Sequence, residues 1–255
     1  MSPRVKYNKS PLAEVIYQLR FPTILSINAN EPAELQEAIR EEYPYYDELI
    51  EEQNQIQINA NENAAQIKQV KGLKNYVFLS QDRAFKINLT ASFIAFSTVA
   101  YTQWEVFRDR IKKLVEVFER IYHPAFYIRV GLRYVDIISK SQWHLEDRSW
   151  NELIKPHILG VVTPEREEGT TSYLVETEHH NALDEYTQKS HIEFVHVNDA
   201  KEVSLLIDCD YFTNEMTQLG DLWIKSEKLH DNSSNYIDNA ITELLKESMD
   251  PVEIQ

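Results

Sequence analysis

The sequence predicts an α+β protein in which a large antiparallel sheet carries amphipathic helices packed on one face. Two observations predict this class. Leu12–Phe21 and Tyr127–Ile138 alternate along their length with the period of two that is typical of β-strands. Residues 102–122 instead repeat apolar side chains at the i, i+3, i+7 spacing of a helix. The resulting order, β-α-β(meander)-α-β in the first half, favours an antiparallel sheet.

The first half of the chain contains most of the expected strands. Pro22 closes the strand Leu12–Phe21, and we expect a short helix near Pro32, because proline suits the first helical turn. A meander with tight turns follows, with turns expected at Gly72, Lys74-Asn75 and Gln81–Arg83. Its expected strands are Gln55–Asn59, Ala65–Val70, Tyr76–Ser80, Ala84–Thr90 and Phe93–Val99. The helix 102–122 should stop before Pro124, ahead of the strand Tyr127–Ile138.

The second half repeats this style. We expect a short helix at Ser149–Ile154 that Pro156 ends, an exposed loop at Pro164–Gly169, and helical patterning over about 233–248. Three antiparallel strands are expected at Tyr173–His179, Ser190–Val197 and Glu202–Tyr211. No stretch resembles a linker, so the halves 1–140 and 141–255 are expected to pack as one compact unit.

Charge is the strongest compositional signal. The chain has 26 Lys+Arg and 41 Asp+Glu, a formal net charge of −15. Such a chain repels nucleic-acid phosphates and anionic membranes, so we expect neither as a partner, whereas acidity suits a basic protein partner. The N-terminal residues lack the apolar region of a signal peptide, and no apolar run is long enough to span a bilayer, which favours a cytoplasmic location.

Arginine side chains interrupt the two alternating strands. Arg20 lies in the first strand, on the same face as Glu14, and Arg129 and Arg133 lie on one face of the second. Gly131 between them permits close approach of a ligand or of another backbone. A half-buried charge is costly unless it is paired. We therefore expect either a carboxylate of this chain or a bound anion opposite these arginines.

Asp208 and Asp210 are candidate partners of those arginines, and the other interpretation is a structural or solvent-facing carboxylate pair. They lie two residues apart in a strand, so their carboxylates share one face. Such a pair can receive Arg129 and Arg133, or hold Mg²⁺ with the help of substrate phosphates. A hairpin could also bring Glu178 opposite His191, but an ordinary surface ladder is the favoured interpretation. We predict no metal site and no cofactor.

Catalytic motifs are missing from the sequence. It contains no G-x-S-x-G, no phosphate-binding Gly-rich loop and no H-E-x-x-H. The single Cys209 excludes an internal disulfide, and its position between two aspartates favours a core residue over a nucleophile.

Four stretches resemble a sporadically distributed, uncharacterised prokaryotic protein family. The first is an N-terminal P-L-x-E-V-I-x-x-L-R-F signature, Pro11–Phe21, and the second is the R-x-G-L-R-Y strand Arg129–Tyr134. The third stretch is Leu205–Asp210, and the fourth is a C-terminal Leu229-His230 followed by Ile241-Thr242 and Leu245. The resemblance brings no known reaction, but the scattered occurrence of the family resembles that of antitoxin, immunity and defence genes.

Two functions from different classes fit these observations. The first is a non-enzymatic, acidic protein-binding role, of the kind expected of an antitoxin-, immunity- or defence-associated protein. The alternative is a ligand-binding or phosphoester- or nucleotide-processing domain with a sheet-lined polar cleft. In both cases the candidate residues for contact with the ligand or partner are Glu14, Arg20, Arg129, Arg133, Asp208 and Asp210. The absence of a catalytic motif favours the first.

Overall fold

The structure is a computed structural model that describes residues 4–59, 64–170, 172–197 and 202–254, with side chains over 7–50, 74–170, 172–197 and 202–252. It confirms the α+β class. The strands are β1 (Arg4–Tyr7), β2 (Leu12–Arg20), β3 (Tyr45–Asn59), β4 (Ala64–Leu79), β5 (Phe85–Leu89), β6 (Phe93–Thr98), β7 (Arg129–Ile138), β8 (Leu174–Asn181), β9 (Tyr186–Val195), β10 (Ser204–Thr213) and β11 (Pro251–Ile254).

The helices are mostly short. They are α1 (Leu25–Ala29), α2 (Ala33–Ile39), α3 (Trp104–Tyr122), α4 (Trp150–Leu153), α5 (Pro156–Leu159), α6 (Pro164–Glu167), α7 (Leu222–Ser233), α8 (Tyr236–Ala240) and α9 (Glu243–Ser248), with 3₁₀ turns η1 (Lys140–Trp143) and η2 (Leu219–Asp221). Within the part of the chain that the structure describes, none of them combines the length and the apolar character that crossing a bilayer requires.

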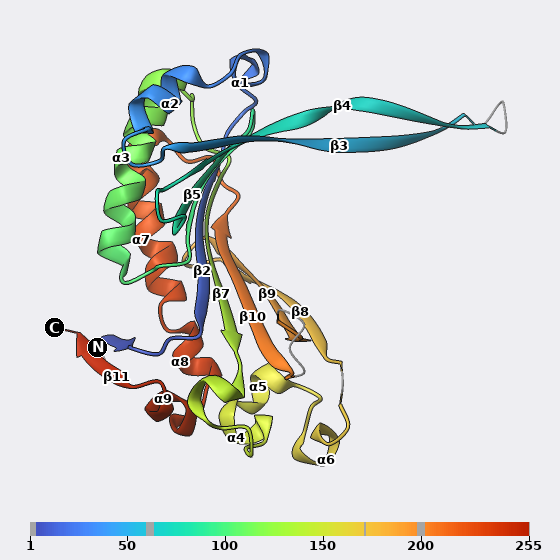
Figure 1. Cartoon of the computed structure of the whole chain (residues 1–255), viewed down its shortest axis with the longest axis vertical. Coiled ribbons are helices and arrows are strands. Elements are labelled where there is room, and N and C mark those ends of the chain that lie inside the picture. The colour runs from blue at the N-terminus through green and yellow to red at the C-terminus, as the bar shows by residue number, and fades with distance from the viewer. Residues whose placement is uncertain (1–3, 60–63, 171, 198–201, 255) are drawn as a thin grey trace. The chain divides into compact units, whose positions relative to one another are not determined.

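β2 to β10 form a nine-stranded antiparallel sheet in the order β3-β4-β5-β6-β2-β7-β10-β9-β8 (Figure 1). β1 and β11 pair separately as a two-stranded antiparallel sheet. The meander strands β3 to β6 are neighbours in sequence and in space, and so are β8 to β10. The two strands with the clearest sequence alternation, β2 and β7, therefore lie side by side at the centre of the sheet.

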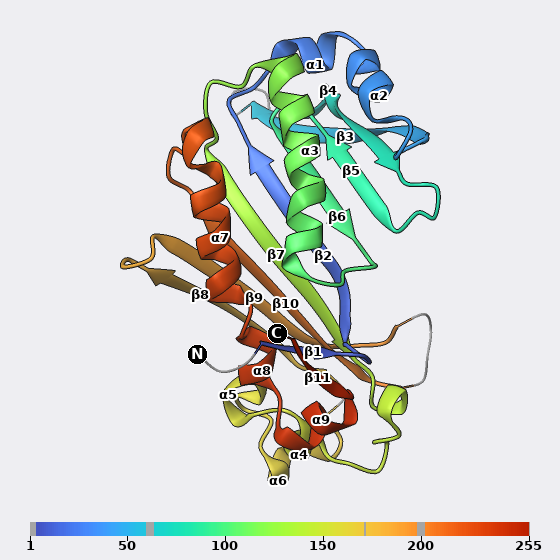
Figure 2. The same cartoon turned by 90° about the vertical axis from the view of Figure 1, so that its left-hand side faces the viewer.

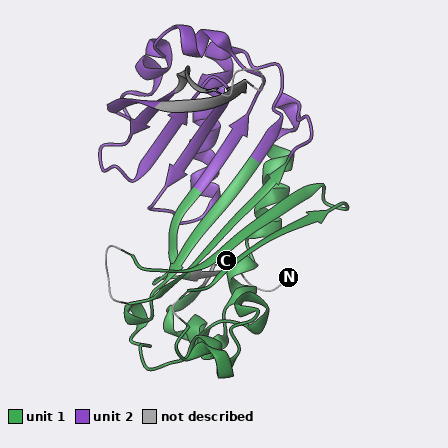
Figure 3. Cartoon of the chain, turned by 90° about the vertical axis from the view of Figure 1, so that its right-hand side faces the viewer, with its two compact units in different colours: residues 1–15, 131–213, 223–255 green, residues 16–130, 214–222 purple. Residues whose placement is uncertain are grey.

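The chain divides into two compact units (Figure 3). Unit 1 contains residues 1–15, 131–213 and 223–255, and unit 2 contains residues 16–130 and 214–222. The first two boundaries fall inside β2 and at the start of β7, and the others follow Thr213 and Leu222, so none lies near residue 140. Each unit is therefore built from segments that are distant in the sequence.

In unit 2, α3 lies against one face of the strands (Figure 2). The contact is aromatic: the ring centroids of Phe21 and Phe118 are 4.9 Å apart, and those of Phe96 and Phe107 are 5.3 Å apart. The buried face of α3 follows the predicted spacing and consists of Trp104, Phe107, Ile111, Leu114, Val115 and Phe118. The helix ends at Tyr122, and His123, with a left-handed φ of 48°, caps it one residue before Pro124.

In unit 1, α7 covers one face of β7 and β10 (Figure 2). Alternate residues of β10 are buried on that face, namely Leu205, Ile207, Cys209 and Tyr211. Tyr134 of β7 reaches α7, with 3.2 Å between its hydroxyl and Nδ1 of His230. The residues that alternate with these, among them Arg133, Asp208 and Asp210, face away from the helix.

The expected turn at Gly72 and Lys74-Asn75 is wrong, because β4 runs through these residues without interruption. The register of β3 against β4 shifts between Glu51 and Gln53. A bulge absorbs an extra residue without ending a strand, and glycine is typical of such positions. β4 pairs with β5 over Tyr76–Leu79 only, so β3 and β4 continue beyond β5 as a two-stranded ribbon (Figure 1).

Three further expectations in the second half are corrected. Pro156 begins α5 instead of merely ending α4, and Pro164–Gly169 contains α6 instead of a plain loop. In both cases proline occupies the first helical turn, where its missing N–H costs nothing. The helix expected over 233–248 is two short helices, α8 and α9, preceded by α7, which passes through His230.

We expect Phe118→Ala to lower the free energy of unfolding by about 3–5 kcal/mol, because it leaves a cavity in a fully buried aromatic cluster. Val106→Ala is the matched control on the same helix, since Val106 is 47% exposed. Its effect should stay within about 0.5 kcal/mol. Chemical denaturation measures both, and equal midpoints for the two variants would contradict the packing of α3.

Candidate functional site

The face of the unit 1 sheet that α7 does not cover carries charged side chains in cross-strand rows. Residues directly opposite one another on antiparallel strands share a face and interact. Asp208 lies opposite His191, which lies opposite Glu176 on β8. In the next row, Asp210 lies opposite Lys189, which lies opposite Glu178. We call this surface the open face: Glu14, Arg133, Glu176, Glu178, Lys189, His191, Glu193, Asp208 and Asp210.

The best-defined contact on the open face joins Arg133 and Asp208. Nε of Arg133 donates to Oδ1 of Asp208 at 2.7 Å, and Nη2 donates to Oδ2. This bidentate pair is half-exposed, since the Arg133 side chain is 45% exposed and that of Asp208 is 12% exposed. The Asp208 hydrogen bonds, with the charges of Asp210 and Glu14, raise the pKa of the Arg133 guanidinium. The predicted arginine–aspartate pairing is therefore confirmed for Arg133.

His191 continues the row across β9. Its Nδ1 lies 3.2 Å from Oε1 of Glu176, and its Nε2 lies 3.0 Å from Oε2 of Glu193. The hydrogen bonds to Glu193 and Glu176 raise the pKa of the imidazole above its ordinary value. When His191 is protonated, the row Glu14, Arg133, Asp208, His191 and Glu176 alternates in sign across five strands.

The hairpin does not place Glu178 opposite His191. β8 ends at Asn181 and β9 begins at Tyr186, so the turn is short and the register puts Lys189 opposite Glu178. Glu178 forms an ion pair with Lys189 at 3.1 Å, and its Oε1 lies 3.2 Å from Nε2 of His180. Over the residues for which side chains are described, no group of three or more His, Cys, Asp and Glu is arranged to hold a metal ion.

Arg20 and Arg129 belong to unit 2 and make a different contact. Both donate to Oε1 of Gln18, from Nε of Arg20 at 3.1 Å and from Nη1 of Arg129 at 3.0 Å. The structure therefore brings together Glu14, Arg133, Asp208 and Asp210 in unit 1. It groups the other two candidates, Arg20 and Arg129, around an amide oxygen in unit 2.

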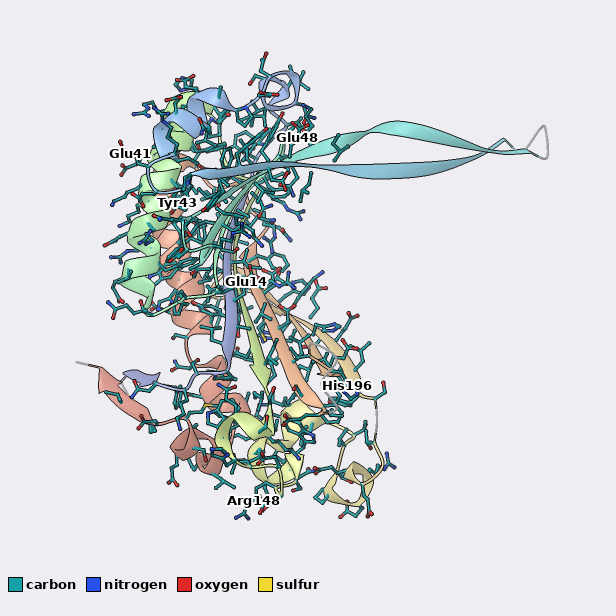
Figure 4. All side chains as sticks on the ribbon, viewed as in Figure 1. Glu14, Glu41, Tyr43, Glu48, Arg148 and His196 are labelled. Atoms are coloured by element: carbon teal, nitrogen blue, oxygen red, sulfur yellow. The ribbon has the colours of Figure 1, made fainter. Side chains whose placement is uncertain are left out.

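The chemistry of the open face is that of an acidic surface with internal ion pairs. The fork of Arg133 is occupied by a carboxylate, which disfavours its use for phosphate binding. Asp208 is committed to Arg133, which disfavours a magnesium site with Asp210. Carboxylates outnumber cationic groups on this face, and one of them, Glu14, lies within β2 (Figure 4). The face therefore suits a cationic partner better than an anionic one.

A buried polar group lies on the other face, beneath α7 and α8. Asp136 is only 6% exposed, and burial, followed by the charge of Asp208, raises the pKa of its carboxyl to about 7. Sγ of Cys209 donates to Oγ of Ser190 at 3.4 Å, and burial raises the pKa of this thiol to about 12. The expectation that Cys209 is a core residue is confirmed, because its thiol is buried.

Comparison with known proteins adds no functional assignment. No protein-family model matches the sequence, and no curated protein matches it significantly. The resemblance carried by Pro11–Phe21 and Arg129–Tyr134 stays a prediction. The geometry of the open face is thus the basis for the function proposed below.

A double-mutant cycle with Arg133→Met and Asp208→Asn should give a coupling free energy of about 1 kcal/mol, because the pair is bidentate and partly shielded from water. The matched control is the exposed pair Arg148 and Glu152, which lie four residues apart at the start of α4 and whose side chains are 46% and 45% exposed. That cycle should give about 0.3–0.5 kcal/mol. A coupling for Arg133 and Asp208 below that of the control would contradict their pairing.

We expect Asp136→Asn to stabilise the protein at pH 8 and to leave its stability nearly unchanged at pH 4. The folded pKa of Asp136 is raised above its unfolded value, so the native state binds the proton more tightly. Stability due to this group is complete below about pH 4 and is lost as the pH rises through about 7. The loss corresponds to roughly 4 kcal/mol.

Denaturation of both proteins across this pH range measures the effect. Asp147→Asn is the control, because Asp147 is an exposed carboxylate in the same unit. A stability difference between Asp136→Asn and the parent that does not change with pH would show that Asp136 remains ionised in the folded protein.

Proposed function

We propose that this protein binds another protein through the open face of unit 1, and that it does so without catalysis. The main support for the proposal is the arrangement of charged side chains on the open face. Arg133, Lys189 and His191 each have carboxylate neighbours, and the surplus of carboxylates remains on the surface. A surface of this kind attracts a partner that presents lysine and arginine.

The physical basis is electrostatic complementarity. A net charge of −15 speeds encounter with a basic partner, and the ion-paired rows hold the carboxylates in fixed positions for docking. Nucleic acids and anionic membranes are disfavoured as partners because each phosphate contact needs a cation. The composition also supports a cytoplasmic location, and the family resemblance supports an antitoxin-, immunity- or defence-associated setting.

The alternative, phosphoester or nucleotide processing, has less support. It needs Arg133 to hold a phosphate, and it needs Asp208 and Asp210 to hold a metal. However, Arg133 and Asp208 already bind one another. An anion would have to displace a bidentate carboxylate before it could bind. The pairing of Arg133 with Asp208 therefore supports protein binding more than it supports catalysis.

The test is capture from the native host, followed by affinity measurements at low and high salt with the purified partner. Asp210→Lys and Glu178→Lys should each weaken binding about tenfold or more, because each reverses a charge on the open face. Glu146→Lys and Asp147→Lys are the matched controls, since these exposed residues lie in the loop after η1 and not on the open face. Their affinities should match the parent.

Two results would contradict the proposal. One is a partner whose affinity is insensitive both to salt and to the open-face substitutions. The other is turnover of nucleotides or phosphoesters by the purified protein that disappears with Asp208→Asn, which would establish the enzymatic alternative.

A further inference from the structure

The outer edge of β3, in unit 2, is a second surface with the properties of a binding site. β3 is a terminal strand of the nine-stranded sheet, and no strand in the described part of the chain pairs with its outer edge. Natural edge strands are usually protected by lysine, proline or short length. β3 has 15 residues and contains no lysine, arginine or proline. The other terminal strand, β8, has 8 residues.

Apolar side chains are exposed where β3 pairs with the end of β4. Within Tyr45–Ile50, which we call the edge segment, Tyr45, Tyr46, Leu49 and Ile50 are between 44% and 61% exposed. The ring of Tyr46 lies 5.5 Å from that of Phe78 and 6.4 Å from that of Tyr76, both fully buried. The edge segment is therefore fixed to the core of unit 2 and presents its apolar side chains in a defined position.

The edge segment is also acidic. Glu48 pairs with Lys74 of the neighbouring strand at 3.0 Å (Figure 4 labels Glu48). The main-chain N–H of Glu48 donates a hydrogen bond to Oδ1 of Asp47 at 2.9 Å. This main-chain donor of β3 is therefore bound to a side chain of the same strand. Two copies of β3 placed antiparallel would oppose like charges, which destabilises a sheet. The charge therefore favours a basic segment over a second copy of this chain.

We propose that the edge segment Tyr45–Ile50 receives an extended, lysine- or arginine-bearing segment of a partner protein as an additional strand. Main-chain hydrogen bonds give such strand addition its affinity, and alternate side chains give it specificity. An arriving carbonyl replaces Asp47 at the Glu48 N–H, and the released carboxylate pairs with a cationic side chain of the partner. This inference does not depend on the open face, because the contacts that support it all lie in unit 2.

The probe is a synthetic peptide that alternates lysine with valine and threonine, and the control peptide has glutamate in place of lysine. Fluorescence anisotropy with the full-length protein measures affinity at low and high salt, and amide hydrogen exchange locates the site. The lysine peptide should bind in a salt-sensitive way and slow exchange at Tyr45–Ile50. The glutamate peptide should not bind.

Leu49→Lys should weaken binding of the lysine peptide about tenfold or more, because it adds a protective charge to the edge. Val99→Lys is the matched control, since Val99 is 64% exposed in unit 2 outside the strands and the charge change is identical. Asp47→Lys is a second edge variant. Circular dichroism and thermal unfolding confirm that each variant folds before its affinity is compared.

Several outcomes would overturn the inference. General attraction to an acidic protein would affect Leu49→Lys and Val99→Lys equally and would protect no amide of β3. Loss of peptide binding in Asp210→Lys, with Leu49→Lys unaffected, would assign the peptide to the open face. Self-association that Leu49→Lys abolishes would identify a second copy of this chain as the occupant of the edge.

Discussion

In each unit a helix covers one face of the strands, α3 in unit 2 and α7 in unit 1, and the rest of the structure depends on this constraint. Successive residues of a strand then lie alternately on the face buried under the helix and on the face exposed to solvent. β7 meets this requirement directly: Val130 and Leu132 are fully buried, whereas Arg133 between Leu132 and Tyr134 is exposed. The apparent conflict of arginine within an apolar strand disappears once the two faces are separated.

The same alternation explains why the charges pair across strands. Side chains on the open face cannot reach the core, so their nearest neighbours are those directly opposite on the next strand. Arg133 meets Asp208 in this way, and Lys189 meets Glu178. Asp136 is the exception, because its place in the alternation puts a carboxyl on the buried face. Protonation offsets part of the cost of its burial, which is why its pKa rises.

Periodicity alone was sufficient for the fold class and for the main elements, including α3, β2 and β7, because each alternates or repeats over many residues. It could not give the register of β8 against β9, since a shift of two residues keeps every side chain on the same face. Glu176 instead of Glu178 therefore faces His191. The continuity of β4 through Gly72 was also missed, because a bulge and a turn have the same local sequence signal. Asp136 could have been found as the polar residue in phase with Tyr134 and Ile138.

The two terminal strands show how this chain distributes protection between its sheet edges. On β8, Glu176 contacts His191 and Glu178 pairs with Lys189, both on β9, and the strand is short. On β3, the pairing of Glu48 with Lys74 also points inward, toward β4, while Tyr45 and Ile50 remain 45% and 61% exposed. Neither terminal strand therefore uses a cation of its own to block its edge, but only β3 combines length with exposed apolar residues. An edge of that kind carries a risk of aggregation unless it is covered. The negative charge of the edge segment offsets that risk among copies of the same chain, because two such segments would place like charges opposite one another. A strand of opposite charge meets no such repulsion at this edge.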